Sequence, residues 1–493
     1  MARLRHTRRS VFPLVTFAAL VLGSLPIQAQ APVQAIAGQY KSVADRLIAA
    51  ALANTDGYAR LEFLTDHIGK RLSGSDSLTR ATQWAAQAMR DAGLQNVTLQ
   101  PVMVPHWVRG AESASITAPI TKPLHMLGLG MSVGTPPAGI TAPVVVVPDF
   151  ATLDRLGRSA IEGKIVVFNA PYKGYGQTVM YRTAGPSRAA ALGAVAVLVR
   201  SITPLAMQTP HTGTTVYDPK QPKIPAAAIS IEDALLLDRL AHQAPTTVHL
   251  DMAAGQLPDA PSFNIYGDLP GSEHPEQIVD VGGHIDSWDV GQGAQDDGSG
   301  ITAALAAVSI IHKLDLHPKR TIRVVFWVNE ENGGAGGKAY LTGLGDQVKN
   351  HVAAIEMDGG AEQPTGYGYG SAGFNRRATP NGPAPAPHLT EAEQHSLALL
   401  QQIATLLAPV GATSVKAGGG GSDISPLMGA GVPGLGEMTT GAHYFDWHHT
   451  EADTLDKVDP QDFRKNVASL AVMTYILADM PDRLAGHPGA GEE

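Results

Sequence analysis

The chain has 493 residues, of which 44% are hydrophobic and 16% are charged, so it is long enough for a large core and more than one domain. Its formal net charge is −9, which argues against nucleic acid or an anionic membrane as a partner. The sequence contains no cysteine, so disulfides and thiolate ligands are excluded. Any metal must therefore be held by His, Asp and Glu.

The first 31 residues have the three-part pattern of a secretory signal peptide. MARLRHTRRS is basic, VFPLVTFAALVLGSL is apolar, and PIQAQA offers small residues for cleavage near Ala29 or Ala31. A membrane anchor is the alternative, but the apolar run is short and a cleavage-like site follows it. We therefore expect an exported protein, periplasmic or secreted, without a membrane anchor after cleavage. TRRSVF resembles a twin-arginine signal only weakly, so the export route, Sec or Tat, stays open. Removing the four arginines of this segment takes the net charge from −9 to about −13.

Composition and periodicity divide the remaining chain. Residues 43–94 have helical periodicity, and the following residues to 107 have the pattern of a strand. Valine-rich strands and alanine-rich helices then lie between two proline-rich joints, GTPPAG and GQLPDAPS, in a segment of domain size. We expect one domain of residues 32–137 and 258–482, an inserted smaller α/β domain of residues 138–257, and a disordered tail of residues 483–493.

After Pro261 strands and helices alternate, which favours an α/β fold with a largely parallel sheet. The expected strands are residues 277–281, 321–328, 352–357 and 432–438. Ala417–Asp423 is glycine-dense and Ala378–His388 is proline-rich, so both are expected to be loops.

Acids and histidines follow the ends of these four strands. In chain order they are His284, Asp286, Asp289, Asp296 and Asp297; Glu330 and Glu331; Asp358; and His448, His449, Glu451 and Asp453. Ligands of open α/β sheets bind beyond the carboxyl ends of the strands, so neighbouring strands would bring these side chains together. Imidazole and carboxylate groups suit zinc, or cobalt or manganese.

Two cations would also explain the adjacent pair Glu330 and Glu331, whose charges repel each other at low dielectric. One aspartate can bridge two metal ions about 3.5–4 Å apart. One glutamate of the pair can then ligate a metal while the other acts as a general base.

Each of these residues also has an ordinary structural explanation. His284 could be a hydrogen-bonded core histidine, and Asp297 or Ser299 could cap the helix that follows. The glutamate pair and the histidine pair could face solvent, and Asp358 could stabilise a turn. A metal centre is favoured because all of these residues occupy like positions after strands.

Four motifs resemble the M28 family of co-catalytic zinc metallopeptidases: GGHIDSWDVGQGAQDDGSG, RTIRVVFWVNEENGGAGGKAY, GGGGSDISPLMGAGVPG and HHTEADTLDKV. HIDSWDVGQGAQDDG is nearest to the carboxypeptidase Q group of dipeptidases, and YARLEFLTDHIGKRLSGSDS matches the opening of the family. The inserted segment resembles a protease-associated domain. The resemblance covers nearly all of the chain after the signal segment. It implies a mixed, largely parallel central sheet flanked by helices, as in the zinc peptidases.

The resemblance assigns residues by position. Five of them would hold two zinc ions, for which cobalt or manganese could substitute: His284 and Asp358 at one ion, Glu331 and His449 at the other, and Asp296 between the two. Glu330 would be the general base that takes a proton from the bridging water and passes it to the leaving amine. Asp286 would orient His284. His449 is preferred over His448 because Thr450 follows it, in the family's His-Thr/Ser order. The Asp296–Asp297 peptide is expected to be cis.

The implied activity is hydrolysis of short peptides with a free N-terminus, dipeptides foremost, by a homodimer. A broader aminopeptidase acting on longer peptides is the main alternative. A glutaminyl cyclase-like aminoacyltransferase is less favoured, since such enzymes normally lack an inserted domain. A non-catalytic receptor-like relative would lack the metal ligands, all of which are present here.

Overall fold

The computed structural model describes residues 36–370 and 389–486. The expected signal peptide, the proline-rich segment Ala378–His388 and residues 487–493 lie outside the described residues. Among the helices of the described part, none is long and apolar enough to cross a membrane.

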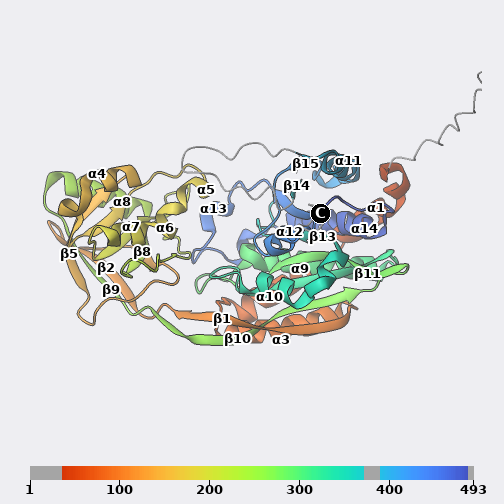
Figure 1. Cartoon of the computed structure of the whole chain (residues 1–493), viewed down its shortest axis with the longest axis horizontal. Helices are drawn as coiled ribbons and strands as arrows, with labels where there is room; N and C mark the ends of the chain where they lie inside the picture. The colour runs from red at the N-terminus through yellow and green to blue at the C-terminus, as the bar shows by residue number, and fades with distance from the viewer. Residues whose placement is uncertain (1–35, 371–388, 487–493) are drawn as a thin grey trace, which may run out of the picture. The chain divides into compact units, whose positions relative to one another are not determined.

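The first sheet has eight strands in the order β1-β10-β12-β11-β13-β16-β14-β15 (Figure 1). Their bounds are β1 Gln95–Val108, β10 Gly255–Leu269, β11 His274–His284, β12 Arg320–Trp327, β13 His351–Glu356, β14 Pro364–Gly370, β15 Ser414–Ala417 and β16 Gly434–Thr439. The central strands β12, β11, β13 and β16 are parallel, and so is the pair β14 and β15. The pairs β1 with β10, β10 with β12 and β14 with β16 are antiparallel. The predicted mixed, largely parallel sheet is confirmed.

Helices pack around this sheet, and α9 (Ser299–Lys313) is the most buried of them. Every residue of α9 from Ser299 to Ile311 is buried, and its alanines allow close packing against α14 (Pro460–Asp479) and β11. The other helices that belong to this part are α1 Ile36–Leu52, α2 Asp56–Phe63, α3 Asp76–Asp91, α10 Ala335–Leu344, α11 Glu391–Thr405, α12 Ser425–Gly429 and α13 Tyr444–Trp447. Because α9 is fixed in the core, the loop that precedes it has a fixed end.

The second sheet has the order β3-β2-β9-β5-β6-β7-β8-β4. Its strands are β2 Glu112–Ala118, β3 Lys122–Pro123, β4 Met126–Gly128, β5 Ile140–Val147, β6 Ile165–Phe168, β7 Ala196–Arg200, β8 Ala226–Ile229 and β9 Thr247–Met252. Its helices are α4 Phe150–Ile161, α5 Tyr175–Thr178, α6 Met180–Thr183, α7 Gly185–Ala191 and α8 Ile231–Gln243. We call residues 112–252 the insert.

The insert therefore begins before the expected boundary at residue 138. Strands β2, β3 and β4 belong to its sheet, although they precede that boundary. They span at most seven residues each, and β3 and β4 only two and three, which is too short for a recognisable alternation. The chain enters the insert from β1 and leaves it into β10, and these two strands pair along most of their length.

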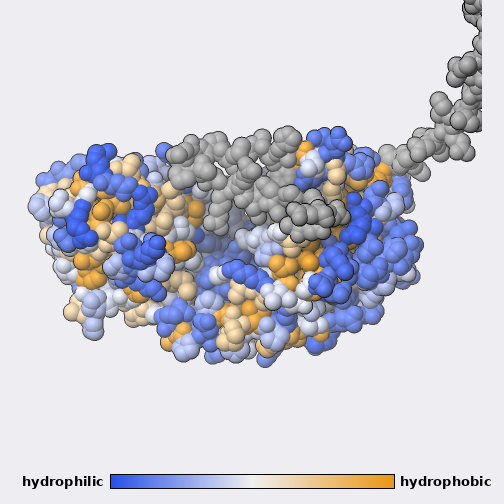
Figure 2. Space-filling model, viewed as in Figure 1, coloured by the Kyte–Doolittle hydropathy of each residue, from blue (hydrophilic) through white to orange (hydrophobic). Residues whose placement is uncertain are grey.

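The described start of the expected tail is packed rather than free. Leu484 is buried, the Ala485 N–H donates to Ser396 Oγ at 2.8 Å, and Tyr369 Oη donates to the Ala485 carbonyl at 2.8 Å. These contacts are distant in sequence, so no local pattern predicts them. On the viewed face, hydrophobic residues lie in small areas among hydrophilic ones (Figure 2).

Glu437 in β16 provides a test of the core. Burial raises the pKa of its carboxyl group to about 8, so the folded protein binds this proton more tightly than the unfolded chain. The stabilisation is complete below about pH 4 and is lost as the pH rises toward 8. The difference in unfolding free energy between Glu437→Gln and the wild type is therefore expected to shift in favour of the variant by at least about 1 kcal/mol when the pH is raised from 5 to 9. Urea unfolding at both pH values measures this difference.

Glu273→Gln, at an exposed position, is the control and should show no such pH dependence. A Glu437→Gln difference that is the same at both pH values would contradict the assignment.

Candidate metal centre

The residues expected to bind metal lie close together beyond the carboxyl ends of β11, β12, β13 and β16. His284 Nε2 is 3.1 Å from Asp296 Oδ1 and 3.3 Å from Asp358 Oδ1. His449 Nε2 is 3.2 Å from Asp296 Oδ2 and 3.1 Å from Glu331 Oε2. The two oxygens of Asp296 thus face two different histidines, each of which has its own second carboxylate.

His448 and His449 occupy different positions. His448 Nε2 lies 3.6 Å from Asp296 Oδ2, and its ring stacks on that of His449 with 3.5 Å between centroids. Aromatic rings of Tyr175 and Phe445 meet His448 edge-on. Asp296 lies near both histidines, and His449 also contacts Glu331.

Asp286 is placed differently from the expectation. His284 Nδ1 is 2.9 Å from the Asp286 backbone carbonyl but 3.8 Å from its carboxylate. The carboxylate instead accepts the backbone N–H groups of Glu330, at 3.1 Å, and Glu331, at 3.4 Å. Asp286 therefore fixes the tautomer of His284 through its main chain, leaving Nε2 free for a metal, and holds the glutamate pair through its side chain.

Burial and mutual repulsion dominate the electrostatics of the site. Burial, with the charge of Asp296, raises the pKa of Glu331 to about 8, and burial raises the pKa of Asp358 to about 7. Burial opposes the charge on His284, yet the nearby Asp358 and Asp296 raise its pKa well above its usual value. Glu331 Oε1 is buried without a hydrogen-bond partner among the described residues. Carboxylate oxygens and imidazole nitrogens that converge in this way fit zinc.

Two other aspartates anchor the loop between β11 and α9. The Asp453 carboxylate accepts the backbone N–H groups of Gln295 and Asp296, at 2.8 and 3.2 Å. The Asp297 carboxylate accepts those of His284 and Gly300, at 3.1 and 3.0 Å, so it also bonds one N–H of the first turn of α9, although the N-cap residue of this helix is Gly298. The Asp296–Asp297 peptide is cis, as expected.

The sequence analysis missed Arg71, which is fully buried under the same loop. Its guanidinium donates to four carbonyl oxygens at 2.7–3.0 Å, those of Gly69, Ile285, Gln292 and Gly293. Burial lowers the pKa of Arg71 to about 10, and nearby acids, Asp453 and Asp286 foremost, oppose this effect. Arg71 lies in no metal-ligand pattern, so the sequence carries no signal for this role.

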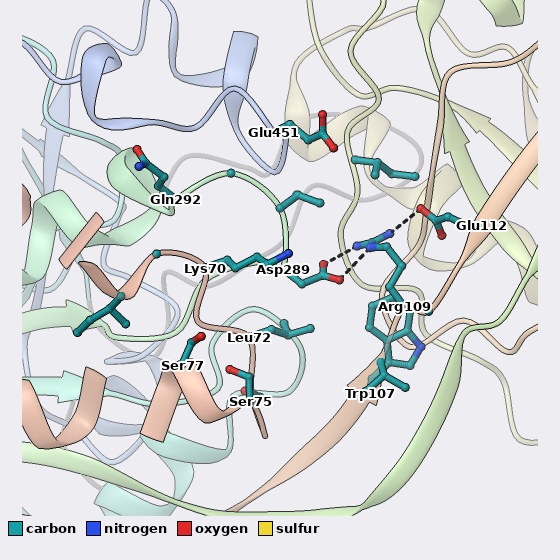
Figure 3. Close-up of a pocket in the computed structure, with 18 of the residues that line it drawn as sticks. Lys70, Leu72, Ser75, Ser77, Trp107, Arg109, Glu112, Asp289, Gln292 and Glu451 are labelled. Atoms are coloured by element: carbon teal, nitrogen blue, oxygen red, sulfur yellow. Dashed lines mark hydrogen bonds and ion pairs between the residues drawn. The ribbon is translucent and has the colours of Figure 1, made fainter. Parts of the chain in front are cut away.

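A pocket of about 1090 Å³ lies beside the loop of residues 289–292, and none of the expected metal ligands lines it (Figure 3). Arg109, near the end of β1, forms one wall with Asp289, and two hydrogen bonds of 2.6 and 2.8 Å join the two side chains. Lys70 and Ser75 also line the pocket, and in the view of Figure 3 the Lys70 side chain extends toward Asp289. The ion pair links the end of β1, just before the insert, to the metal-site loop.

Comparison with known proteins identifies the family. Residues 264–474 match the model of peptidase family M28. The chain is 41% identical to human carboxypeptidase Q over 433 residues, which cover 88% of this chain and 87% of that protein. It is 40% identical to carboxypeptidase Q of Xenopus laevis, with 90% and 91% of the two chains covered.

Solved structures are also similar to this chain. The peptidase M28 precursor from Shewanella amazonensis SB2B has a TM-score of 0.82 and 33% identity, and the match covers 91% of this chain and 98% of that chain. A zinc aminopeptidase from Bacillus subtilis, at 18% identity and a TM-score of 0.63, shares the fold, with 87% and 96% of the chains covered. The chain therefore belongs to peptidase family M28 and is a metallopeptidase.

Replacing Arg71 tests how the loop is held. Arg71→Met leaves four carbonyl groups without their donors, so we expect a loss of about 3 kcal/mol of unfolding free energy. Arg71→Lys should recover only part of it, because an ammonium group lacks the planar fork of donors. Arg80→Met, at an exposed position on α3, is the control and should change stability by less than about 0.5 kcal/mol. Urea unfolding that shows Arg71→Met as stable as the wild type would refute this role.

Proposed function

We propose that the protein is an exported di-zinc peptidase that hydrolyses short peptides with a free N-terminus, dipeptides foremost. The observation that carries the proposal is the position of Asp296, whose two oxygens lie 3.1 and 3.2 Å from two histidine Nε2 atoms. A single metal ion would need only one histidine and its neighbouring carboxylates, whereas two such sets face Asp296. The similarity to carboxypeptidase Q supports a peptidase.

The five ligands assigned from the sequence would hold the two ions: His284 and Asp358 at the first, Glu331 and His449 at the second, and Asp296 shared. When bound, zinc polarises a carbonyl group and lowers the pKa of a water molecule. Cobalt or manganese could replace zinc in the same donor set.

Glu330 is proposed as the general base. Its side chain is partly exposed, whereas that of Glu331 is buried against His449. The backbone N–H of Glu330 is fixed by Asp286, so the carboxylate projects from a fixed point beside the ligands. From there it takes a proton from the attacking water and passes it to the leaving amine. We also propose that the protein is a homodimer and that the insert is a protease-associated domain.

Glu330→Gln separates the base from the ligands. The variant is expected to keep its zinc, because Glu330 is not a ligand, and to lose about 10² to 10⁴-fold in kcat. Metal analysis and initial rates on a dipeptide measure both quantities. Glu273→Gln should retain wild-type turnover. Turnover by Glu330→Gln close to the wild type would refute the base assignment.

A peptide panel tests the substrate class. Mass spectrometry should show cleavage of unblocked dipeptides and none of N-acetylated dipeptides. Stepwise trimming of longer peptides would identify a broader aminopeptidase instead. Cyclisation of a Gln-initiated peptide would indicate a glutaminyl cyclase-like reaction.

A further inference from the structure

A short segment of the insert contacts the metal centre. The Thr212 N–H donates to the His449 carbonyl at 3.0 Å, and the Thr212 carbonyl lies 3.3 Å from His449 Nδ1. The hydroxyl of Thr214 donates to the Glu331 carbonyl at 2.7 Å. Thr212 is fully buried, so water does not compete for its two hydrogen bonds.

The two residues that this segment contacts are those assigned to the same zinc ion. His449 Nδ1 lies 3.3 Å from the Thr212 carbonyl and 3.4 Å from a guanidinium nitrogen of Arg182. In the tautomer with the proton on Nδ1, this nitrogen donates to the Thr212 carbonyl and Nε2 has its lone pair toward Asp296 and Glu331. His284 is fixed differently, by the carbonyl of Asp286 from its own loop. The two halves of the site therefore obtain their orienting groups from different parts of the chain.

Arg182 in α6 holds this segment in place. It is 6% exposed, and its guanidinium donates to the Thr212 carbonyl at 3.0 Å and to Tyr175 Oη at 2.7 Å. Its partners among the described residues, the Thr212 carbonyl, the Tyr175 hydroxyl and His449 Nδ1, include no carboxylate, which is unusual for a buried charge. The guanidinium lies against the Gly213 backbone, where a Cβ would come within 2.1 Å of one of its nitrogens. Only glycine leaves room for this contact.

The other face of Thr212 is fixed as well. Its hydroxyl donates to the Gly128 carbonyl at 2.7 Å, and Arg109 donates to the same carbonyl and, at 3.4 Å, to the Thr212 hydroxyl. Arg109 is the residue paired with Asp289 in the pocket wall (Figure 3). The segment is thus held on one side by Arg182 of the insert and on the other by Gly128 of the insert and by Arg109, which directly follows β1.

We infer that Thr212, Thr214 and Arg182 are positioning residues by which the insert sets His449 and Glu331 for one of the two zinc ions. The affinity for this ion then depends on the insert, whereas the affinity for the ion at His284 and Asp358 does not. The inference rests on the proposed di-zinc function.

Zinc retention tests the inference. Purified full-length variants are loaded with zinc and dialysed against a graded series of a zinc chelator, and bound zinc is measured by mass spectrometry. Thr214→Val and Arg182→Met are expected to lose one ion at a chelator strength at least about tenfold lower than the wild type, and to keep the other ion unchanged. Thr214→Ser keeps the hydroxyl and should restore wild-type retention.

Matched controls are available in the same part of the chain. Thr209→Val removes a hydroxyl that bonds only to its own loop, and Arg188→Met removes an exposed partner of Asp154. Both should retain two ions as the wild type does. His284→Ala removes a proposed ligand of the first ion, and His449→Ala removes one of the second ion. These two variants serve as references for the loss of each ion.

Equal retention of both ions by Thr214→Val, Arg182→Met and the wild type would overturn the inference and leave the proposed function intact. Equally reduced retention of both ions in these variants would also overturn it, since a general loss of stability predicts that result. A wild-type protein that binds no zinc would instead refute the proposed function itself.

Discussion

Burying several carboxylates at one edge of a sheet is the constraint on which this structure depends. Each unpaired charge at low dielectric costs several kcal/mol, and acids that share a site repel one another. The raised pKa values of Glu331 and Asp358 reflect this cost. Such a cluster persists when cations and N–H donors compensate it, and the surrounding loops supply the donors.

The acids divide into two groups according to their partners. Asp286, Asp297 and Asp453 each accept two backbone N–H groups and thereby fix the glutamate pair, the first turn of α9 and the loop that carries Asp296. The three others, Asp296, Glu331 and Asp358, lie against the Nε2 atoms of His284 and His449. The first group builds the loops with main-chain hydrogen bonds, so the second group is available for metal. Arg71 adds a buried cation beneath the same loop.

The sequence predicts the convergence of the site because strand ends are local features with a known meaning in α/β sheets. Residues after β11, β12, β13 and β16 lie close together, and His449, which the order of His449 and Thr450 favours, contacts Glu331. The carboxylate role of Asp286, the position of Arg71 and the contacts of Thr212 depend on residues far apart in the chain. Their residue types are unremarkable locally, so periodicity and motif spacing contain no information about them. The start of the insert was missed for a similar reason, since β3 and β4 are recognisable only by their partners in the sheet.

Two metal ions held on either side of Asp296 are the central claim. Anomalous scattering at the zinc edge, measured from crystals of the zinc-loaded protein, tests it most directly. We expect two peaks about 3.5–4 Å apart, one between His284 and Asp358 and the other between His449 and Glu331, with Asp296 between the peaks. A single peak, or two peaks away from these side chains, would contradict the account.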